Sequence, residues 1–136
     1  MKEQNNSDYT KVKPYSATED KTPQLQRMFN TISGKYDTFN DIMSWGMARV
    51  WRKKALKSLA PFDPKRILDI ATGTGDVAIK SFEYLQPEHI TGVDISDQMM
   101  EIGKEKVSKI GLNGKIDFAV EDCATLSFDD ATFDAA

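Results

Sequence analysis

The chain has 136 residues, with 18 Lys and Arg residues against 21 Asp and Glu residues, a formal net charge of −3, one Cys and one His. One Cys and one His cannot form a disulfide framework or a Cys/His zinc site, and the mild negative charge argues against bulk nucleic-acid binding. No apolar run approaches the roughly 20 residues of a membrane span and no signal peptide is recognisable, so we expect a cytoplasmic protein with no metal site.

The chain divides into three parts by composition and hydrophobic pattern. Residues 1–21 carry four Lys and four acidic residues and follow neither a helical nor a strand period, which predicts a flexible tail. Residues 22–62 show the 3.6-residue period of amphipathic helices, which predicts a helical cap. Residues 63–136 alternate short apolar runs with amphipathic stretches, which predicts an α/β domain.

Three helices are expected in the cap. The first begins with Thr22 as its cap and Pro23 as its first helical residue, buries one apolar face, and ends at Gly34. The second has Tyr36, Phe39, Ile42 and Met43 on one side and breaks near Gly46. The third covers residues 47–59, after which two prolines prevent its continuation.

The order strand, helix, strand, helix, strand in the second half predicts a parallel sheet with right-handed crossovers. The fold class is therefore α/β, a Rossmann-like doubly wound parallel sheet preceded by the helical cap. Phe133 begins a fourth apolar run, so we expect this sequence to be the N-terminal part of a longer protein. The expected strands cover residues 66–71, 90–95 and 116–120. The expected helices cover residues 76–85 and, after Ser96 as the cap residue, a stretch that runs through about Ile110.

The turn between the first strand and its helix is the first candidate site. Gly73 and Gly75 let the backbone bend sharply and let a ligand approach without a Cβ atom in the way. The N–H groups of the following helix point toward such a ligand. Asp69 lies inside the strand, where a buried carboxylate destabilises the fold unless it has a binding partner. That partner is expected to be either a ligand or the loop itself.

Two further acids follow at the ends of the next strands. Asp94 comes 19 residues after Gly75, where an acid in this topology accepts both hydroxyls of a ribose, or else caps the next helix. Asp122 ends the third strand, where its carboxylate and the next backbone N–H are placed to read an adenine edge, or else cap a turn. Cys123 is expected to be a small buried group rather than a nucleophile.

The glycine turn alone does not identify which nucleotide the protein binds. Residues 73–78 also satisfy Gly-x-Gly-x-x-Ala, the fingerprint of NAD-dependent oxidoreductases. The NAD hypothesis assigns no special role to Asp122. A role for Asp122 in binding would therefore favour a different nucleotide over NAD. A third hypothesis is a nucleotide-binding fragment without enzymatic activity.

The motifs taken together resemble a known family. The helical part, with Phe29-x-x-Ile32-x-x-x-Tyr36-Asp37-x-x-Asn40 and Trp51-Arg52, resembles the ubiquinone/menaquinone biosynthesis C-methyltransferases, and the resemblance covers residues 11–136. The strand ends resemble the successive motifs of class I S-adenosylmethionine-dependent methyltransferases. These are Asp69-x-Ala71-x-Gly73-Thr74-Gly75-Asp76, Gly92-Val93-Asp94-Ile95-Ser96 and Glu121-Asp122-Cys123-Ala124.

The resemblance implies S-adenosyl-L-methionine as cofactor and C-methylation of the ring of a demethylmenaquinol or related polyprenyl quinol. It implies a seven-strand sheet, of which this chain holds the first three to four strands, so that the fragment alone is inactive and the catalytic base lies beyond Ala136. Ala48 departs from the family, which often has His or Asp there. The implied cofactor contacts are Gly73, Thr74 and Gly75 for the methionine end, Asp94 for the ribose, and Asp122 with Cys123 for the adenine. Asp69 is a further expected cofactor-binding residue.

The remaining candidate residues either allow two interpretations or are not expected to belong to the site. On the cap, Tyr36, Asp37 and Asn40 either face the quinol ring or have packing and capping roles. His89 precedes the second strand at the end of the sheet opposite Asp94, which predicts a surface residue. No catalytic residue is assigned.

The third cap helix, residues 47–59, is basic on one side. This side is either a solvated face or a peripheral contact with anionic headgroups at the inner face of the cell membrane, where a polyprenyl quinol resides. The basic residues are Arg49, Arg52, Lys53 and Lys57, and their apolar neighbours are Met47, Val50, Trp51 and Ala55.

Overall fold

The computed structural model describes residues 18–44 and 46–136, so the predicted tail lies almost entirely outside the described residues. Three helices come first: α1 (Lys21–Ile32), α2 (Tyr36–Met43) and α3 (Met47–Leu59). An α/β unit follows, with β1 (Arg66–Ile70), α4 (Asp76–Leu85), β2 (His89–Asp94), α5 (Asp97–Lys109) and β3 (Ile116–Val120). No helix in residues 18–44 and 46–136 has the length and apolar character needed to cross a bilayer.

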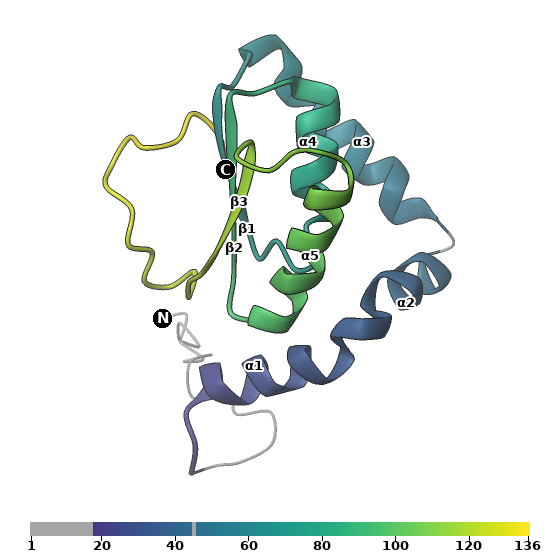
Figure 1. Ribbon diagram of the computed structural model, residues 1–136, viewed down its shortest axis with the longest axis vertical. Coiled ribbons are helices and arrows are strands. Elements are labelled where there is room, and N and C mark those ends of the chain that lie inside the picture. The colour runs from purple at the N-terminus through teal and green to yellow at the C-terminus, as the bar shows by residue number, and fades with distance from the viewer. Residues whose placement is uncertain (1–17, 45) are drawn as a thin grey trace, which may run out of the picture.

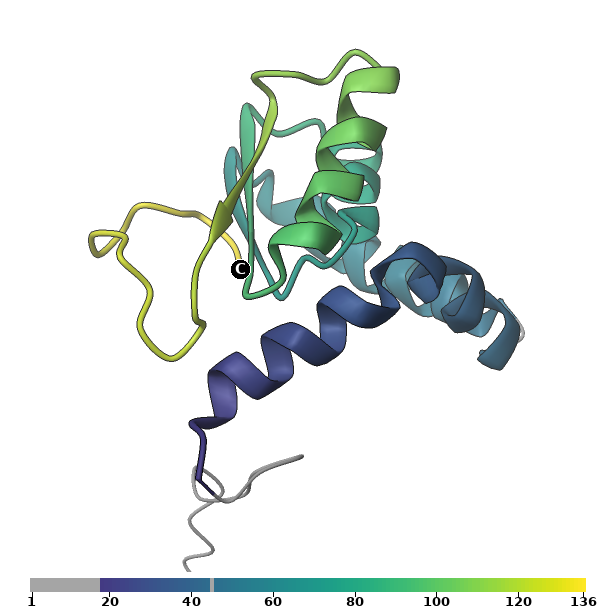
Figure 2. The same ribbon diagram turned by 60° about the horizontal axis from the view of Figure 1, so that its bottom comes forward.

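The strands form a parallel sheet in the order β1-β2-β3, as the alternation of strands and helices predicts. Helices α4 and α5 cover one face of this sheet, and the segment after β3 turns away on the other side (Figure 1). Helix α1 crosses outside the carboxyl ends of the strands, and the turned view shows the same arrangement (Figure 2). The helical part therefore covers the edge at which the candidate site residues lie.

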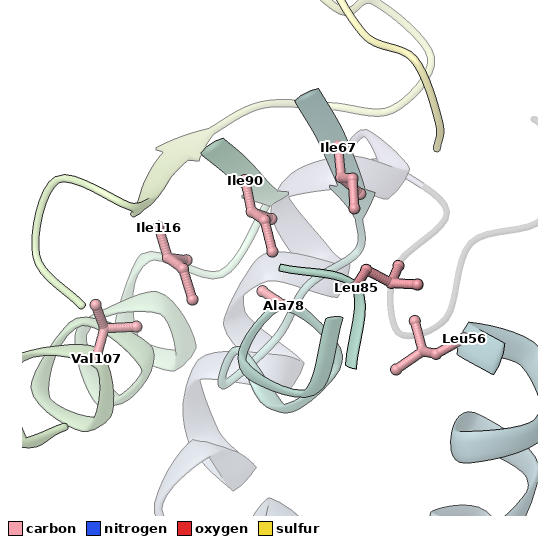
Figure 3. Packing of buried hydrophobic residues seen from close by; sticks show 7 residues of the cluster. All are labelled: Leu56, Ile67, Ala78, Leu85, Ile90, Val107 and Ile116. Atoms are coloured by element: carbon pink, nitrogen blue, oxygen red, sulfur yellow. The ribbon is translucent and has the colours of Figure 1, made fainter. Parts of the chain in front are cut away.

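One row of side chains builds the core between the sheet and its helices. Ile67, Ile90 and Ile116 are register partners on adjacent strands, and all three point toward the helices (Figure 3). They pack against Ala78 and Leu85 of α4, Val107 of α5 and Leu56 of α3. Burying an isoleucine contributes roughly 1.5–3 kcal/mol, so this row fixes the sheet and the position of α3.

The predicted start of α1 is wrong in its details. The helix begins at Lys21, with Asp20 as its N-cap residue and no side-chain capping bond, so residue 21 belongs to the helix and not to the tail. Thr22 does not cap the helix, because its hydroxyl donates a hydrogen bond to Asp122 Oδ2 at 3.0 Å. Pro23 still fits the first helical turn, where backbone N–H groups have no intrahelical partner.

The predicted apolar face of α1 is only partly buried. The fully buried residue of this helix is polar Gln24, whose amide donates to the carbonyl of Glu19 at 2.9 Å. Ile32, at the end of the predicted face, is 42% exposed. Helix α1 is therefore held at the site by polar contacts as well as by apolar packing.

The segment from Phe133 lies where a fourth strand is predicted. Ala135 forms a parallel bridge with Ile67, and its carbonyl accepts a hydrogen bond from the N–H of Leu68 at 2.9 Å. The carboxylate of Asp134 accepts from the N–H groups of Lys65 and Arg66, each at 2.8 Å. These bonds place the segment beside β1 on the edge away from β2, although within the described residues it forms a single bridge rather than a ladder.

Candidate functional site at the carboxyl edge of the sheet

Three residues of the turn after β1 have a left-handed backbone conformation. Ala71, Gly73 and Gly75 have φ values of 58°, 57° and 82°. An alanine in this region is strained by roughly 1–2 kcal/mol, whereas a glycine is not. The turn therefore needs both glycines, and it stores strain at Ala71, which lines the cavity described below.

The two glycines have different surroundings. A Cβ atom added at Gly75 would lie 2.9 Å from Cζ of Phe118, whereas one added at Gly73 would meet nothing closer than 3.7 Å. Gly75 therefore lets the turn pack on the Phe118 ring. Gly73 faces the cavity, where the missing side chain leaves the backbone open to a ligand.

Asp94, at the end of β2, holds the turn and the next helix together. Its Oδ2 accepts a hydrogen bond from the N–H of Gly73 at 2.8 Å, and its Oδ1 accepts one from the N–H of Ser96 at 2.9 Å. Ser96 caps α5 as predicted, with its hydroxyl accepting from the N–H of Met99. Each carboxylate oxygen of Asp94 keeps a second lone pair for a ligand hydroxyl.

Asp122, after β3, connects the strand end to α1. Its Oδ2 accepts from the hydroxyl of Thr22, and its Oδ1 accepts from the N–H of Ala124 at 2.9 Å. The turn-capping role is therefore present, and the carboxylate also lines the cavity. The expectation that Cys123 is buried is wrong: its side chain is exposed, because the chain turns outward after β3.

A cavity of about 230 Å³ lies between this edge of the sheet and the helical part. Leu25 and Phe29 of α1 and Tyr36 of α2 line one side. Asp94, Glu121 and Asp122 line the other, and no Lys or Arg of the described residues lines it. The cavity combines apolar walls with negative charge, which suits a ligand that has an apolar ring, hydroxyl groups and a positive charge.

The structure brings four of the predicted site residues to this cavity: Gly73, Asp94, Asp122 and Cys123. Asp69, Thr74 and Gly75 do not line it. Asp69 accepts a hydrogen bond from the hydroxyl of Thr72 at 2.7 Å and supports the turn, and burial raises the pKa of its carboxyl group. Thr74 is buried and donates to Asp37 Oδ1 at 2.5 Å.

Sequence reasoning missed the contribution of α1 to the site. Leu25 and Phe29 line the cavity, and Thr22 bonds to Asp122 across 100 positions of sequence. An apolar helix face indicates that a helix packs against something, but it does not say against what. His89 lies at the opposite end of β2 from Asp94 and bonds to Asp117 at 2.9 Å, away from the cavity as predicted.

Known proteins are similar to the chain over most of its length. The model of the ubiE/COQ5 methyltransferase family matches residues 16–136. A demethylmenaquinone methyltransferase of Bacteroides fragilis is 52% identical over 125 residues, which cover 92% of this chain and 51% of that protein. A protein of the same name from Porphyromonas gingivalis is 46% identical, with coverage of 92% and 51%. A ubiquinone/menaquinone biosynthesis C-methyltransferase UbiE of Geotalea daltonii is 40% identical, with coverage of 85% and 50%.

Solved structures share the fold. The crystal structure of the [4+2]-cyclase SpnF matches with a TM-score of 0.71 and 22% identity, over 84% of this chain and 47% of that one. The YcgJ protein of Bacillus subtilis matches with a TM-score of 0.52 and 24% identity, over 60% and 36%. The chain spans about half the length of the curated relatives it matches. On the family match and these identities, the chain belongs to the ubiE/COQ5 methyltransferase family.

Proposed function

We propose that the chain holds the cofactor-binding part of an S-adenosylmethionine-dependent enzyme that methylates a ring carbon of a demethylmenaquinol. One observation carries the proposal: Gly73, Asp94 and Asp122, from three successive strand ends, line one cavity. The names of the similar bacterial proteins support the reaction and the substrate class. Relatives named for both ubiquinone and menaquinone leave related polyprenyl quinols within the same class.

The residues present fit this cofactor. Asp94 would accept hydrogen bonds from the ribose hydroxyls, and Asp122 with the backbone of Cys123 would contact the adenine edge, with Leu25 and Phe29 as apolar walls. The negative charge of the three acidic residues that line the cavity favours a cationic sulfonium ligand. It disfavours the pyrophosphate of NAD, because like charges at close range repel. The cavity therefore supports S-adenosylmethionine over the oxidoreductase alternative.

The role of this part of the enzyme is to position the reacting groups. When bound, the cofactor supplies an electrophilic methyl group, and the ring carbon beside a quinol oxygen is a suitable nucleophile for it. The side chains on α1 and α2 would exclude water from the reacting groups, and Asp94 would fix the direction in which the cofactor lies. We assign no residue of this chain as the base that removes the ring proton.

Calorimetry on the full-length protein tests the cofactor. We expect S-adenosylhomocysteine to bind and NADH not to bind. Asp94→Ala should weaken S-adenosylhomocysteine binding, whereas His89→Ala, at the far end of the same strand, should not. Binding of NADH alone would overturn the proposal. Transfer of a labelled methyl group to a short-chain demethylmenaquinol, and not to its oxidised quinone, tests the reaction.

We also propose that α2 and α3 contact an anionic membrane surface where the quinol enters. Two of the predicted cations are neutralised internally, since Arg49 pairs with Asp41 and Arg52 lies 3.6 Å from Asp76. Lys53 and Lys57 are exposed and flank apolar side chains that face solvent. Those side chains are Phe39, Ile42, Met43, Met47, Val50 and Trp51, each 44–67% exposed.

Flotation of the full-length protein with vesicles tests this contact. Vesicles that contain phosphatidylglycerol should bind more protein than vesicles of phosphatidylcholine alone. Trp51→Ala should weaken binding to both kinds of vesicle, and Lys53→Glu with Lys57→Glu should remove the preference for the anionic lipid. Equal weak binding by wild type and variants, or coverage of Trp51 by another part of the protein, would contradict the proposal.

A further inference from the structure

Lys106 of α5 lies at the junction of three other segments. Its ammonium group donates hydrogen bonds to Asp37 of α2, to the hydroxyl of Thr74 at 3.1 Å, and to Asp76 at the start of α4 at 3.0 Å. The hydroxyl of Thr74 in turn donates to Asp37. We name these four residues, Asp37, Thr74, Asp76 and Lys106, the lysine junction.

The lysine junction satisfies the ammonium group completely. An ammonium has three N–H donors and no acceptor, and each donor has an oxygen partner here. The Lys106 side chain is 30% exposed. Burial lowers its pKa, but the bonds to Asp37 and Asp76 outweigh that effect and the pKa is raised overall. Lys106 is therefore charged at neutral pH, and it holds the two acids together against their mutual repulsion.

The lysine junction joins the two sides of the cavity. Asp37 follows Tyr36, which lines the helical side. Thr74 stands between Gly73, which lines the sheet side, and Gly75. A displacement of α2 therefore pulls on the glycine turn through the direct bond between Thr74 and Asp37, and Lys106 ties both of these residues to the framework of α5.

We propose that Lys106 is a positioning residue that couples the placement of α2 to the geometry of the glycine turn, so that cofactor affinity depends on it although it does not line the cavity. The inference rests on the proposed function, because the affinity in question is for S-adenosylmethionine and its products. The coupling itself is a property of the fold and has a readout that needs no cofactor.

Lys106→Met tests the proposal in the full-length protein, since methionine keeps most of the side-chain length and removes the charge. S-adenosylhomocysteine should bind at least fivefold more weakly by calorimetry. Amide hydrogen exchange should become faster in residues 36–43 and also in residues 73–77. Lys104→Met is the matched control, because Lys104 lies on the same helix and, among residues 18–44 and 46–136, pairs with exposed Glu101 and not with the lysine junction. It should change neither quantity.

A second variant separates positioning from simple stability. Lys106→Met leaves Asp37 without its cation, which is destabilising, and Asp37→Asn in addition removes that unpaired charge. The double variant should therefore recover thermal stability relative to Lys106→Met, but its affinity should stay low because the tie of α2 and the glycine turn to α5 through Lys106 is still missing. Recovery of wild-type affinity would overturn the proposal. If Lys106→Met does not fold, the same affinity and hydrogen-exchange measurements are made on the single variant Asp37→Asn.

The two proposals fail in different ways. If the wild-type protein does not bind S-adenosylhomocysteine, the proposed function fails, and the exchange measurement still decides the coupling. If the wild type binds and folded Lys106→Met has an affinity within twofold of it, the positioning role is wrong. Faster exchange in residues 36–43 without a change in residues 73–77 would also contradict it.

Discussion

The carboxylate of Asp94 accepts a hydrogen bond of 2.8 Å from the backbone N–H of Gly73, so the acid at the end of β2 holds the glycine turn at the end of β1. The same side chain starts α5 through the N–H of Ser96. The two interpretations of Asp94 from sequence, a helix-start contact and a ligand contact, are therefore compatible. One residue can shape the site and face the ligand.

Asp94→Ala should weaken both the fold and cofactor binding. Hydrogen bonds to a charged group contribute roughly 1.5–3 kcal/mol each, so the loss of a ribose contact should lower affinity for S-adenosylhomocysteine by an order of magnitude or more. Calorimetry measures the affinity, and urea unfolding measures the lost stability. Ile116→Val is the control, because it costs about 0.5–1.5 kcal/mol of stability in the core without touching the cavity. Unchanged affinity in folded Asp94→Ala would reject the ribose assignment.

Cofactor binding should protect Cys123 from alkylation. Cys123 is exposed and lines the cavity, and it is the one cysteine in the chain. Saturating S-adenosylhomocysteine should therefore slow its reaction with iodoacetamide severalfold, as mass spectrometry of the peptide that contains residue 123 would show. NADH at the same concentration should give no protection. Equal labelling rates with and without S-adenosylhomocysteine would place the ligand elsewhere.

Gly75→Ala should destabilise the protein strongly. The added Cβ would lie 2.9 Å from the Phe118 ring, and the residue has a φ of +82°. A left-handed alanine costs roughly 1–2 kcal/mol, and overpacking adds about 1–3 kcal/mol. Gly34→Ala is the matched control, since nothing lies within 4 Å of its added Cβ. It should be neutral or slightly stabilising in urea unfolding, and equal stability of the two variants would contradict the role of Gly75.

Local signals in the sequence predicted most of the fold. The bounds of α3, α4 and β3 agree with prediction, because hydrophobic period, glycine and proline act within a few residues. Thr22 failed as a cap because its hydroxyl has a partner far along the chain. The lysine junction could not be predicted from the sequence for the same reason, because Lys106 and Asp37 are 69 positions apart. A lysine near the end of a helix otherwise indicates only a favourable interaction with the helix dipole.

Asp69 should make stability fall as pH rises above the ordinary range of aspartate. Burial raises the pKa of its carboxyl group above 3.8, and the bonds from Thr72 and Ala78 oppose this only in part. The folded state therefore favours the protonated form. The stabilising contribution is complete below pH 3.8 and is lost as pH rises through the raised pKa.

Asp69→Asn removes this titration. The difference in unfolding free energy between variant and wild type should shift in favour of the variant as pH rises from about 4 to 7, in urea series at each pH. Asp134→Asn serves as the control, because backbone N–H bonds lower the pKa of Asp134 and its contribution changes only as pH falls below 3.8. Wild type and Asp69→Asn curves that run parallel over this range would show that Asp69 does not titrate there, and that the strand end tolerates its charge without cost.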